Sequence, residues 1–224
     1  MTIEIELSVK EKKNIMKYVL VFLLLGLTVA IYSQKRYRAD ETNYYDIKRW
    51  EVADLILKST QETITGVVYS KRDNGQLIFE SNYENGKIDG SYKSWYKNGQ
   101  LSYKSNYKNG KEVGLSSLWY ENGQMRSEEN YINGKLDGFR RSWWQSGQLK
   151  DEGKYKNGII DGLQKKWYQN GRLQHEWNFK NGKRTGIQRY WHMNGQLRFQ
   201  DDYKDGKFIS EKCWDEDGKE IECD

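Results

Sequence analysis

The chain has 224 residues, 37 of them basic and 32 acidic, for a formal net charge of +5. The two signs are interleaved along the chain, so the sequence lacks the clustered basic patch of a nucleic-acid-binding protein, and nucleic acid is not an expected partner. Proline is absent and glycine is frequent, at 21 residues. This composition agrees with paired strands joined by tight turns.

Residues 1–33 form a charged start followed by an apolar run over residues 18–33. A spanning helix needs about 17–25 apolar residues, whereas the core of a signal peptide needs about 7–15. Read from Met16, the segment resembles a complete bacterial signal peptide, with a small-x-small cleavage pattern at 28–30 and a second option after Ser33. The run therefore predicts a hydrophobic helix that is either a cleaved signal peptide or an anchor, with Met1 or Met16 as the start.

The basic residues around this run favour a cytoplasmic amino terminus, because Lys10, Lys12, Lys13 and Lys17 outnumber the three basic residues that follow it. The rest of the chain is then expected outside the cytoplasm. Two localisations remain open. The protein is exported to the cell envelope, the periplasm or the medium, or it sits in the inner membrane with a single amino-terminal span and its repeats outside.

Two segments separate the apolar run from the repeats. Residues 34–51 are polar and predict a junction, and residues 52–66 alternate enough to predict an amino-terminal capping hairpin. Repeat arrays need atypical end units of this kind to protect their open edges.

Six rows of 24 residues fill residues 67–210 without an insertion. Asn-Gly steps favour two-residue type I′ hairpin turns, because Asn and Gly tolerate positive φ. With such turns Tyr96 pairs with Leu101, and Tyr107 pairs with Glu112. Two glycine columns mark the predicted turns, at Gly75, Gly99, Gly123, Gly147, Gly171 and Gly195 and at Gly86, Gly110, Gly134, Gly158, Gly182 and Gly206. A fixed period of this length is typical of repeat proteins.

The predicted fold class is all-β: one elongated, antiparallel β-meander of two-stranded, 24-residue repeats, preceded by a hydrophobic helix. Successive residues of a strand point to opposite faces, so both faces carry an aromatic stripe unless a bulge at the row-ending glycine shifts the register. Packing between neighbouring strands explains the positions of most of these rings. The alternative is an exposed ridge that binds a ligand, with the candidate residues Trp95, Tyr96, Trp119, Tyr120, Trp143, Trp144, Trp167, Tyr168 and Trp191.

Residues 211–224 form a half repeat whose charges blunt the last edge strand and serve as a carboxy-terminal cap. Cys213 and Cys223, the two cysteines of the chain, lie on either side of a turn, and export would favour a disulfide between them. A two-residue turn pairs Cys213 with Glu222 instead, so the disulfide needs a wider loop or a frayed end, and the sequence leaves the bond open. Four metal ligands are not available around them, and no metal site is predicted.

No catalytic constellation stands out from the repeat. His175 and His192 occupy different columns, and the Asp that precedes Gly in several rows is explained by turn chemistry. We predict a non-enzymatic protein without a cofactor.

The rows, such as "WYENGQMRSEENYINGKLDG", resemble the MORN-repeat variant family, bacterial proteins often labelled as antitoxin components of toxin-antitoxin systems. The resemblance covers residues 66–224 and implies interaction and membrane-associating modules. Where eukaryotic MORN repeats tend to have His before the Gly, this chain has "NGKIDG" or "NGKEVG".

Three functions follow. The first is an exported or membrane-anchored scaffold that binds a protein partner or a membrane surface, with residues 18–33 as the membrane contact if they are not cleaved. The second is a cell-surface glycan-binding protein, because Trp-Tyr pairs near Asn-Gly turns also resemble choline-binding and glucan-binding repeats, although the period and the Gly-Trp opening differ. The third is a cytosolic antitoxin, which the apolar run opposes.

Overall fold

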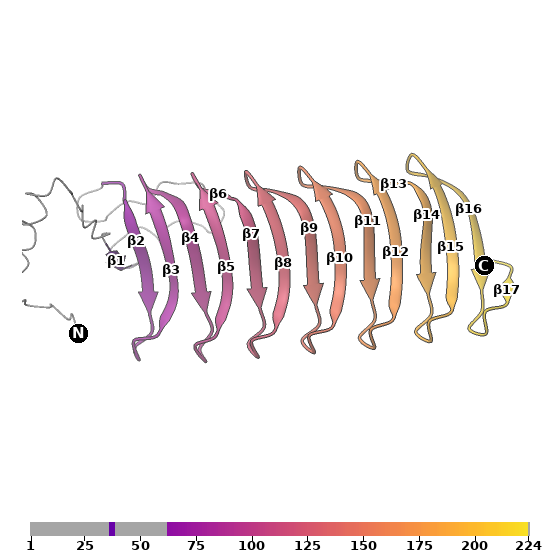
Figure 1. Cartoon of the computed structure of the whole chain (residues 1–224), viewed down its shortest axis with the longest axis horizontal. Coiled ribbons are helices and arrows are strands. Elements are labelled where there is room, and N and C mark those ends of the chain that lie inside the picture. Colours follow the sequence, from indigo (N-terminus) through magenta and orange to yellow (C-terminus); the bar gives the residue numbers. More distant parts are fainter. Residues whose placement is uncertain (1–35, 39–61, 224) are drawn as a thin grey trace, which may run out of the picture. The chain divides into compact units, whose positions relative to one another are not determined.

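The computed structural model describes residues 36–38 and 62–223. They form seventeen strands of one sheet, with no helix among them. The predicted antiparallel meander is confirmed (Figure 1). The predicted hydrophobic helix, most of the predicted junction over 34–51 and most of the capping hairpin over 52–66 lie outside the described residues; within the junction, residues 36–38 form a strand. Within those residues, no helix has the length and apolar character needed to cross a membrane.

Strand β1 (Arg36–Arg38) pairs in parallel with β2 (Gly66–Lys71), and from β2 onward all pairing is antiparallel. The remaining strands are β3 (Leu77–Glu84), β4 (Lys87–Trp95), β5 (Leu101–Lys108), β6 (Lys111–Glu112), β7 (Gly114–Trp119), β8 (Met125–Ile132), β9 (Lys135–Trp143), β10 (Leu149–Lys156), β11 (Ile159–Trp167), β12 (Leu173–Lys180), β13 (Lys183–Arg184), β14 (Gly186–Trp191), β15 (Leu197–Lys204), β16 (Lys207–Trp214) and β17 (Glu220–Ile221). They lie side by side in chain order (Figure 1).

The turns gather along two opposite rims of the sheet (Figure 1). The upper rim holds the two-residue turns at 85–86, 109–110, 133–134, 157–158, 181–182 and 205–206. Their central residues, such as Asn109 with φ 49° and Gly110 with φ 77°, both have positive φ. Tyr107 pairs with Glu112 across one of these turns, as predicted. The upper rim therefore has the type I′ geometry expected from Asn-Gly.

The lower rim differs from the prediction, although it also carries Asn-Gly. Gly99 N–H donates to the Tyr96 carbonyl at 3.1 Å, and Tyr96 N–H donates to the Gln100 carbonyl at 2.8 Å. Gly99 has positive φ, whereas Asn98 does not. This is a three-residue loop, a type I turn followed by a glycine bulge. The predicted pairing of Tyr96 with Leu101 is therefore wrong.

The residue that pairs with Leu101 is Trp95, one position earlier than predicted. The register also shifts between Ser94 and Trp95, and the same shift recurs beside every other lower turn except the last, so a bulge adjoins six of the lower turns. All twelve predicted turn glycines have positive φ, six on each rim. The glycines were thus in the expected places, but only one rim has the expected turn.

The two faces of the sheet follow from the pairing, because residues paired across antiparallel strands share a face. The tyrosine face carries the column Tyr83, Tyr107, Tyr131, Tyr155, Phe179 and Tyr203. The tryptophan face carries the column Trp95, Trp119, Trp143, Trp167 and Trp191, and each of these rings is half-buried. Both faces thus carry an aromatic stripe.

The buried core is small for the length of the sheet. Among the described residues, Ile64, Val68 and Phe79 form a buried apolar cluster at the amino-terminal end. Elsewhere the buried side chains are mostly polar, such as Ser105 and Gln188. Neighbouring repeats therefore stabilise one another through cross-strand packing and hydrogen bonds more than through one common core.

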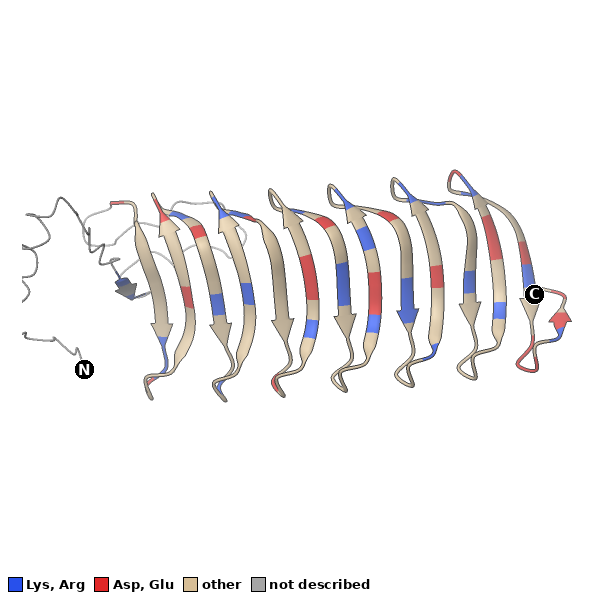
Figure 2. Ribbon diagram, viewed as in Figure 1, with Lys and Arg blue, Asp and Glu red and all other residues tan. Residues whose placement is uncertain are grey.

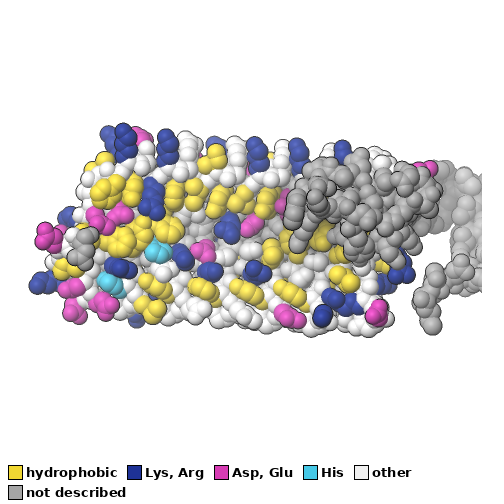
Figure 3. Space-filling model, turned by 180° about the vertical axis from the view of Figure 1, so that it is seen from behind, with side chains coloured by type: hydrophobic (Ala, Val, Ile, Leu, Met, Phe, Trp, Pro, Cys, Tyr) yellow, Lys and Arg dark blue, Asp and Glu magenta, His cyan; other side chains and the backbone are white. Residues whose placement is uncertain are grey.

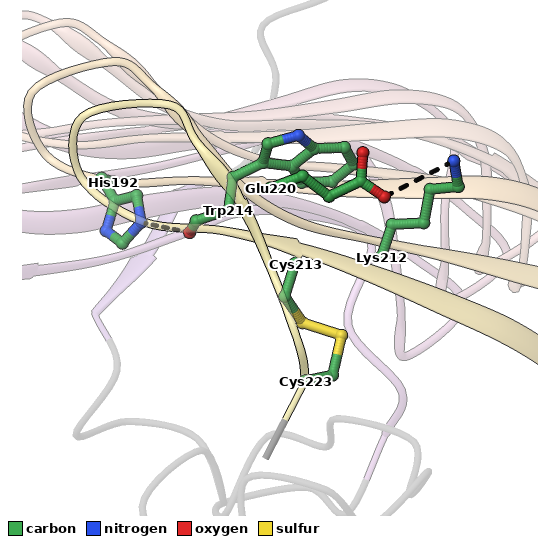
Figure 4. The surroundings of a disulfide bond; sticks show 6 residues. All are labelled: His192, Lys212, Cys213, Trp214, Glu220 and Cys223. Atoms are coloured by element: carbon green, nitrogen blue, oxygen red, sulfur yellow. Dashed lines mark hydrogen bonds and ion pairs between the residues drawn. A yellow bond between two sulfur atoms is a disulfide. The ribbon is translucent and has the colours of Figure 1, made fainter.

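The carboxy-terminal end closes with a hairpin between β16 and β17 and a disulfide between Cys213 and Cys223, whose Cα atoms are 5.4 Å apart (Figure 4). The turn is again the three-residue type, with Gly218 N–H donating to the Asp215 carbonyl at 3.1 Å. Cys213 pairs with Ile221, not with Glu222. This wider loop lets Cys223 come back beside Cys213.

Candidate interaction surface

Lysines gather along the upper rim. Each of its turns, taken with the residue before and after it, contributes one or two of them, and all are exposed. We call this row the lysine rim; its members are Lys87, Lys108, Lys111, Lys135, Lys156, Lys180, Lys183, Lys204 and Lys207. The same turn positions hold two acidic residues, Glu84 and Asp205. Successive repeats lie about 10 Å apart, two strand spacings, so the charges recur at a nearly constant interval.

The lower rim has no such excess. Its turns, counted with their flanking residues, hold four basic and five acidic residues. Three of the acidic residues, Asp215, Glu216 and Asp217, lie in the last turn. Figure 2 shows basic residues recurring along the upper edge of the sheet, and Figure 3 shows basic side chains along the same edge from behind. The folded sheet thus separates charges that are interleaved in the sequence.

Three aspartates behind the lysine rim fix its turns. Asp89 accepts a hydrogen bond from the Asn109 N–H at 3.0 Å, and Asp137 accepts one from the Asn157 N–H at 2.9 Å. Asp161 accepts a longer bond from the next turn along, at 3.3 Å. The backbone N–H of Asn109 and the ammonium of Lys108 lower the pKa of Asp89. These aspartates do more than shape their own turns, because each one caps the turn of the following repeat.

Most lysines of the rim are not neutralised by these carboxylates. Lys108 lies 3.0 Å from Asp89, and Lys180 lies 3.8 Å from Asp161. Six others form no ion pair with a described residue: Lys111, Lys135, Lys156, Lys183, Lys204 and Lys207. The middle and the carboxy-terminal part of the rim therefore keep their positive charge.

Two isoleucines interrupt the lysines. Ile132 and Ile159 flank upper turns and are 53% and 52% exposed. Exposed apolar groups beside basic ones are typical of membrane-surface contacts. The rim thus combines unpaired positive charge with exposed apolar tips.

The lower rim is held together by side chains that reach from one repeat to the next. The Tyr96 hydroxyl donates to the Trp119 carbonyl at 2.7 Å, and Tyr120 and Tyr168 repeat this contact with Trp143 and Trp191 at 2.8 Å. Asparagine side chains add a second set of bonds between turns, donated by Asn98, Asn122, Asn170 and Asn194. We call these two sets the clasp bonds.

The repeat with the turn at 145–147 lacks both clasp bonds and has no replacement for them among the described residues, whereas in the first lower turn Arg72 donates to the Trp95 carbonyl at 3.2 Å in place of a tyrosine. Trp144 stands where its neighbours have Tyr, and its Nε1 is buried without a hydrogen-bond partner among the described residues. Lys150 lies 4.6 Å from the centre of its ring. Ser146 stands where the other turns have Asn and is too short to reach the next turn. The lower rim is therefore least connected between the turns at 145–147 and 169–171.

The tryptophan face carries a ladder of charges with an apolar stripe beside it. Arg141 bonds Glu152 at 2.6 Å, and Arg189 bonds Glu176 at 3.1 Å. The apolar stripe follows the row-ending glycines; Leu115, Phe139 and Leu163 are 49%, 49% and 41% exposed. These apolar side chains occupy equivalent positions of three consecutive repeats and form one line.

The tyrosine face is polar inside. Glu112 accepts hydrogen bonds from Tyr103 at 2.5 Å and from Ser105 at 2.8 Å. His175 stacks on Trp177 with ring centres 4.7 Å apart, and burial together with nearby Lys166 lowers its pKa to about 4. A hollow of about 190 Å³ lies over Gly153, lined by Arg140, Asp151, Tyr155 and Trp177 among others.

A family comparison accounts for the periodicity. The model of the MORN repeat variant matches six consecutive segments, residues 64–87, 88–109, 112–133, 136–157, 160–181 and 184–205. The chain belongs to the MORN repeat variant family. No curated protein matches the chain in a sequence comparison. MORN repeats are generally non-catalytic scaffolds for protein or membrane interactions.

The candidate ridge residues have two different roles in the structure of the MORN repeats. Trp95, Trp119, Trp143, Trp167 and Trp191 are half-buried on the tryptophan face. The tyrosines of the ridge use their hydroxyls in clasp bonds within the sheet. The structure thus does not gather the nine candidates into one open surface.

The lysine rim was not predicted from the sequence, because each row taken alone interleaves basic and acidic residues. Aligning the six MORN repeats on Asn-Gly would have revealed it, since lysine flanks the turn in every row. The clasp bonds had no comparable signal, because the lower turn was assigned the wrong type.

Proposed function

We propose that this protein is a non-enzymatic, exported or membrane-anchored scaffold whose lysine rim binds an anionic membrane surface. The observation that supports the proposal is the row of lysines on one rim, six of them without an ion pair to a described residue. Each basic residue near an anionic leaflet contributes about 1 kcal/mol of binding free energy. Four lysines acting together are then worth about a thousandfold in affinity.

Two features favour a membrane over another polyanion. Ile132 and Ile159 stand at the rim, where they can enter the interface, whereas a nucleic-acid backbone offers them nothing. The predicted helix over residues 18–33, if it is retained, would hold the repeats near a bilayer. A helix and a basic edge supply two membrane signals, and stable anchoring generally needs two.

The test compares variants of the full-length chain in vesicle flotation. The rim variant replaces Lys111, Lys135, Lys156 and Lys183 with Ser. The control variant removes the same charge from exposed positions off the rim, with Lys97, Lys104, Arg126 and Arg198 replaced by Ser. Vesicles of phosphatidylcholine with phosphatidylglycerol are set against vesicles of phosphatidylcholine alone, which report the contribution of residues 18–33.

We expect the rim variant to bind the anionic vesicles at least about a hundredfold more weakly than the control variant, with a smaller salt dependence. Equal binding by the two variants would contradict the proposal. Duplex DNA is the comparison ligand. If the chain binds DNA as tightly as anionic vesicles, and the same lysines are needed, the rim is a general polyanion site and the membrane assignment fails.

A second candidate function is binding of a protein partner, supported by the exposed line of Leu115, Phe139 and Leu163. A photo-reactive amino acid at position 139 would test it in cells. One discrete cross-linked protein, lost when Leu163 is replaced by Ser, is the expected result. A cross-linking pattern that Leu163→Ser leaves unchanged would count against this stripe.

A further inference from the structure

The carboxy-terminal end of the tyrosine face brings two cysteine sulfurs and a carboxylate together. Ligand atoms of Glu211, Cys213 and Cys223 all lie within 4.8 Å of one another. Glu211 and Cys213 are two residues apart on β16, so their side chains leave the same face of the sheet. Cys223 reaches this face from the segment after β17, where it forms the disulfide (Figure 4).

A second carboxylate adjoins this group. Asp201 of β15 pairs with Glu211 across the sheet. Its side chain is 6% exposed, and Oδ1 has no hydrogen-bond partner among the described residues. A buried carboxylate oxygen without a donor is costly, because it has lost water and gained no partner. A cation bound by Glu211 would place a positive charge beside this carboxylate.

We propose that reduction of the Cys213–Cys223 disulfide converts this end of the sheet into a site for Zn²⁺ or a similar divalent cation, with Glu211 as the oxygen ligand and the Asp201 carboxylate beside it. Thiolate sulfur and carboxylate oxygen are both ligands that Zn²⁺ takes, in tetrahedral sites of four ligands. The two sulfurs and the Glu211 carboxylate supply three of the four ligands, which leaves the fourth position for water. No other described part of the chain places two sulfurs beside a carboxylate.

A dithiol reductant transfers two electrons and two protons to the disulfide, becomes a disulfide itself and leaves two thiols on the chain. Binding of Zn²⁺ then displaces the two thiol protons, and two Zn–S bonds form. The disulfide and the metal site exclude each other, because the same two sulfurs form either the S–S bond or the bonds to the metal.

Either state joins β16 to the end of the chain. In the oxidised state the disulfide makes this link, helped by an ion pair between Lys212 and Glu220 at 3.8 Å (Figure 4). In the reduced state the metal would make it. Among the described residues, only the short strand β17 covers the outer edge of β16, so a cross-link that persists under both redox conditions protects that edge.

The experiment is a Co²⁺ titration of the full-length chain before and after reduction with a phosphine. Co²⁺ stands in for Zn²⁺ because its thiolate complexes absorb light. We expect one Co²⁺ per chain with a thiolate-to-metal band, seen only after reduction and abolished by one equivalent of Zn²⁺. Glu211→Gln should weaken Co²⁺ binding by about tenfold or more, as replacement of a ligand does, and Asp201→Asn, which removes only a neighbouring negative charge, should weaken it less.

Glu220→Gln is the matched control, since Glu220 lies in the same hairpin but not among the ligands, and it should leave the affinity unchanged. Circular dichroism of each variant checks that the sheet persists. The proposal is overturned if the reduced chain takes up no Co²⁺, or if Glu211→Gln binds Co²⁺ as tightly as Glu220→Gln. The latter result would mean that two cysteines bind metal without a built site.

Discussion

The two rims of the sheet carry the same Asn-Gly dipeptide and yet differ in almost every other respect. On the upper rim both turn residues have positive φ, and on the lower rim only the glycine does. The upper rim exposes lysines, and on the lower rim the side chains form clasp bonds between repeats. A turn dipeptide therefore does not determine the turn; the strands that flank it and the contacts of its side chains do.

The asparagine side chains explain why the rims diverge. On the lower rim the side-chain oxygen Oδ1 of Asn98 accepts a hydrogen bond from the Gln100 N–H at 3.0 Å. The side-chain Nδ2 of Asn98 donates to the Glu121 carbonyl at 2.7 Å. On the upper rim the backbone N–H of Asn109 is bound by Asp89 of the preceding repeat. One rim uses asparagine for its side chain, and the other uses it for its tolerance of positive φ.

The largest expected effect separates these two uses of asparagine. Asn133→Val places a β-branched residue at φ 51° on the upper rim and should lower the free energy of unfolding by about 1–3 kcal/mol. Asn133→Gly should cost little, because glycine adopts this φ freely. On the lower rim, Asn122→Gly should cost about as much as Asn122→Val, since both lose the side-chain bonds. Urea denaturation measures all four, and equal costs for the two Asn133 variants would contradict the assignment.

In the centre of the sheet, between the rims, His175 makes the stability of the fold sensitive to acid. His175 has its pKa lowered to about 4, so the folded state keeps it neutral. Below about pH 6.5 the unfolded chain takes up a proton that the folded chain does not, and stability falls as the pH drops toward 4. His175→Phe should remove about 1–3 kcal/mol of this loss between about pH 7 and pH 4.5.

Thermal denaturation across this pH range, with wild type and His175→Phe side by side, measures the difference. Above about pH 6.5 the two curves should run parallel. If the difference between them is the same at all pH values, the His175 ring is not the acid-sensitive group.

Much of this fold could be predicted from the sequence, because the glycine columns fix where the chain turns and the 24-residue period fixes how often. The turn type on the lower rim could not, since Asn98-Gly99 and Asn109-Gly110 read alike; the difference arises from the bulge beside Trp95, which depends on pairing between strands. The lysine rim was visible in principle as a column. The approach of Glu211 to the two cysteines was not, because it depends on that same wider loop at the last turn.

A smaller effect is expected from single clasp bonds on the lower rim. Tyr120→Phe removes the bond to the Trp143 carbonyl and leaves the ring in place, so the free energy of unfolding should fall by about 1 kcal/mol. Lys97→Ala in the preceding lower turn should change it by less than about 0.5 kcal/mol. Chemical denaturation of both variants measures the two changes. A Tyr120→Phe variant as stable as wild type would mean that the clasp bonds do not contribute to the stability of the lower rim.

The smallest effect expected is a gain, at the place where the lower rim lacks its clasp bonds. Ser146→Asn restores the side chain that its neighbours carry, and its amide can then donate to the Gln169 carbonyl, as Asn122 does to Gln145 at 3.0 Å. One such bond should raise the free energy of unfolding by about 0.5–1 kcal/mol. Trp144→Tyr is the companion variant, but its gain should be smaller, because the new hydroxyl bond comes with loss of the indole packing and of the contact with Lys150. If Ser146→Asn destabilises the chain, the turn at 145–147 has a geometry of its own, and the lower rim is not one repeated structure.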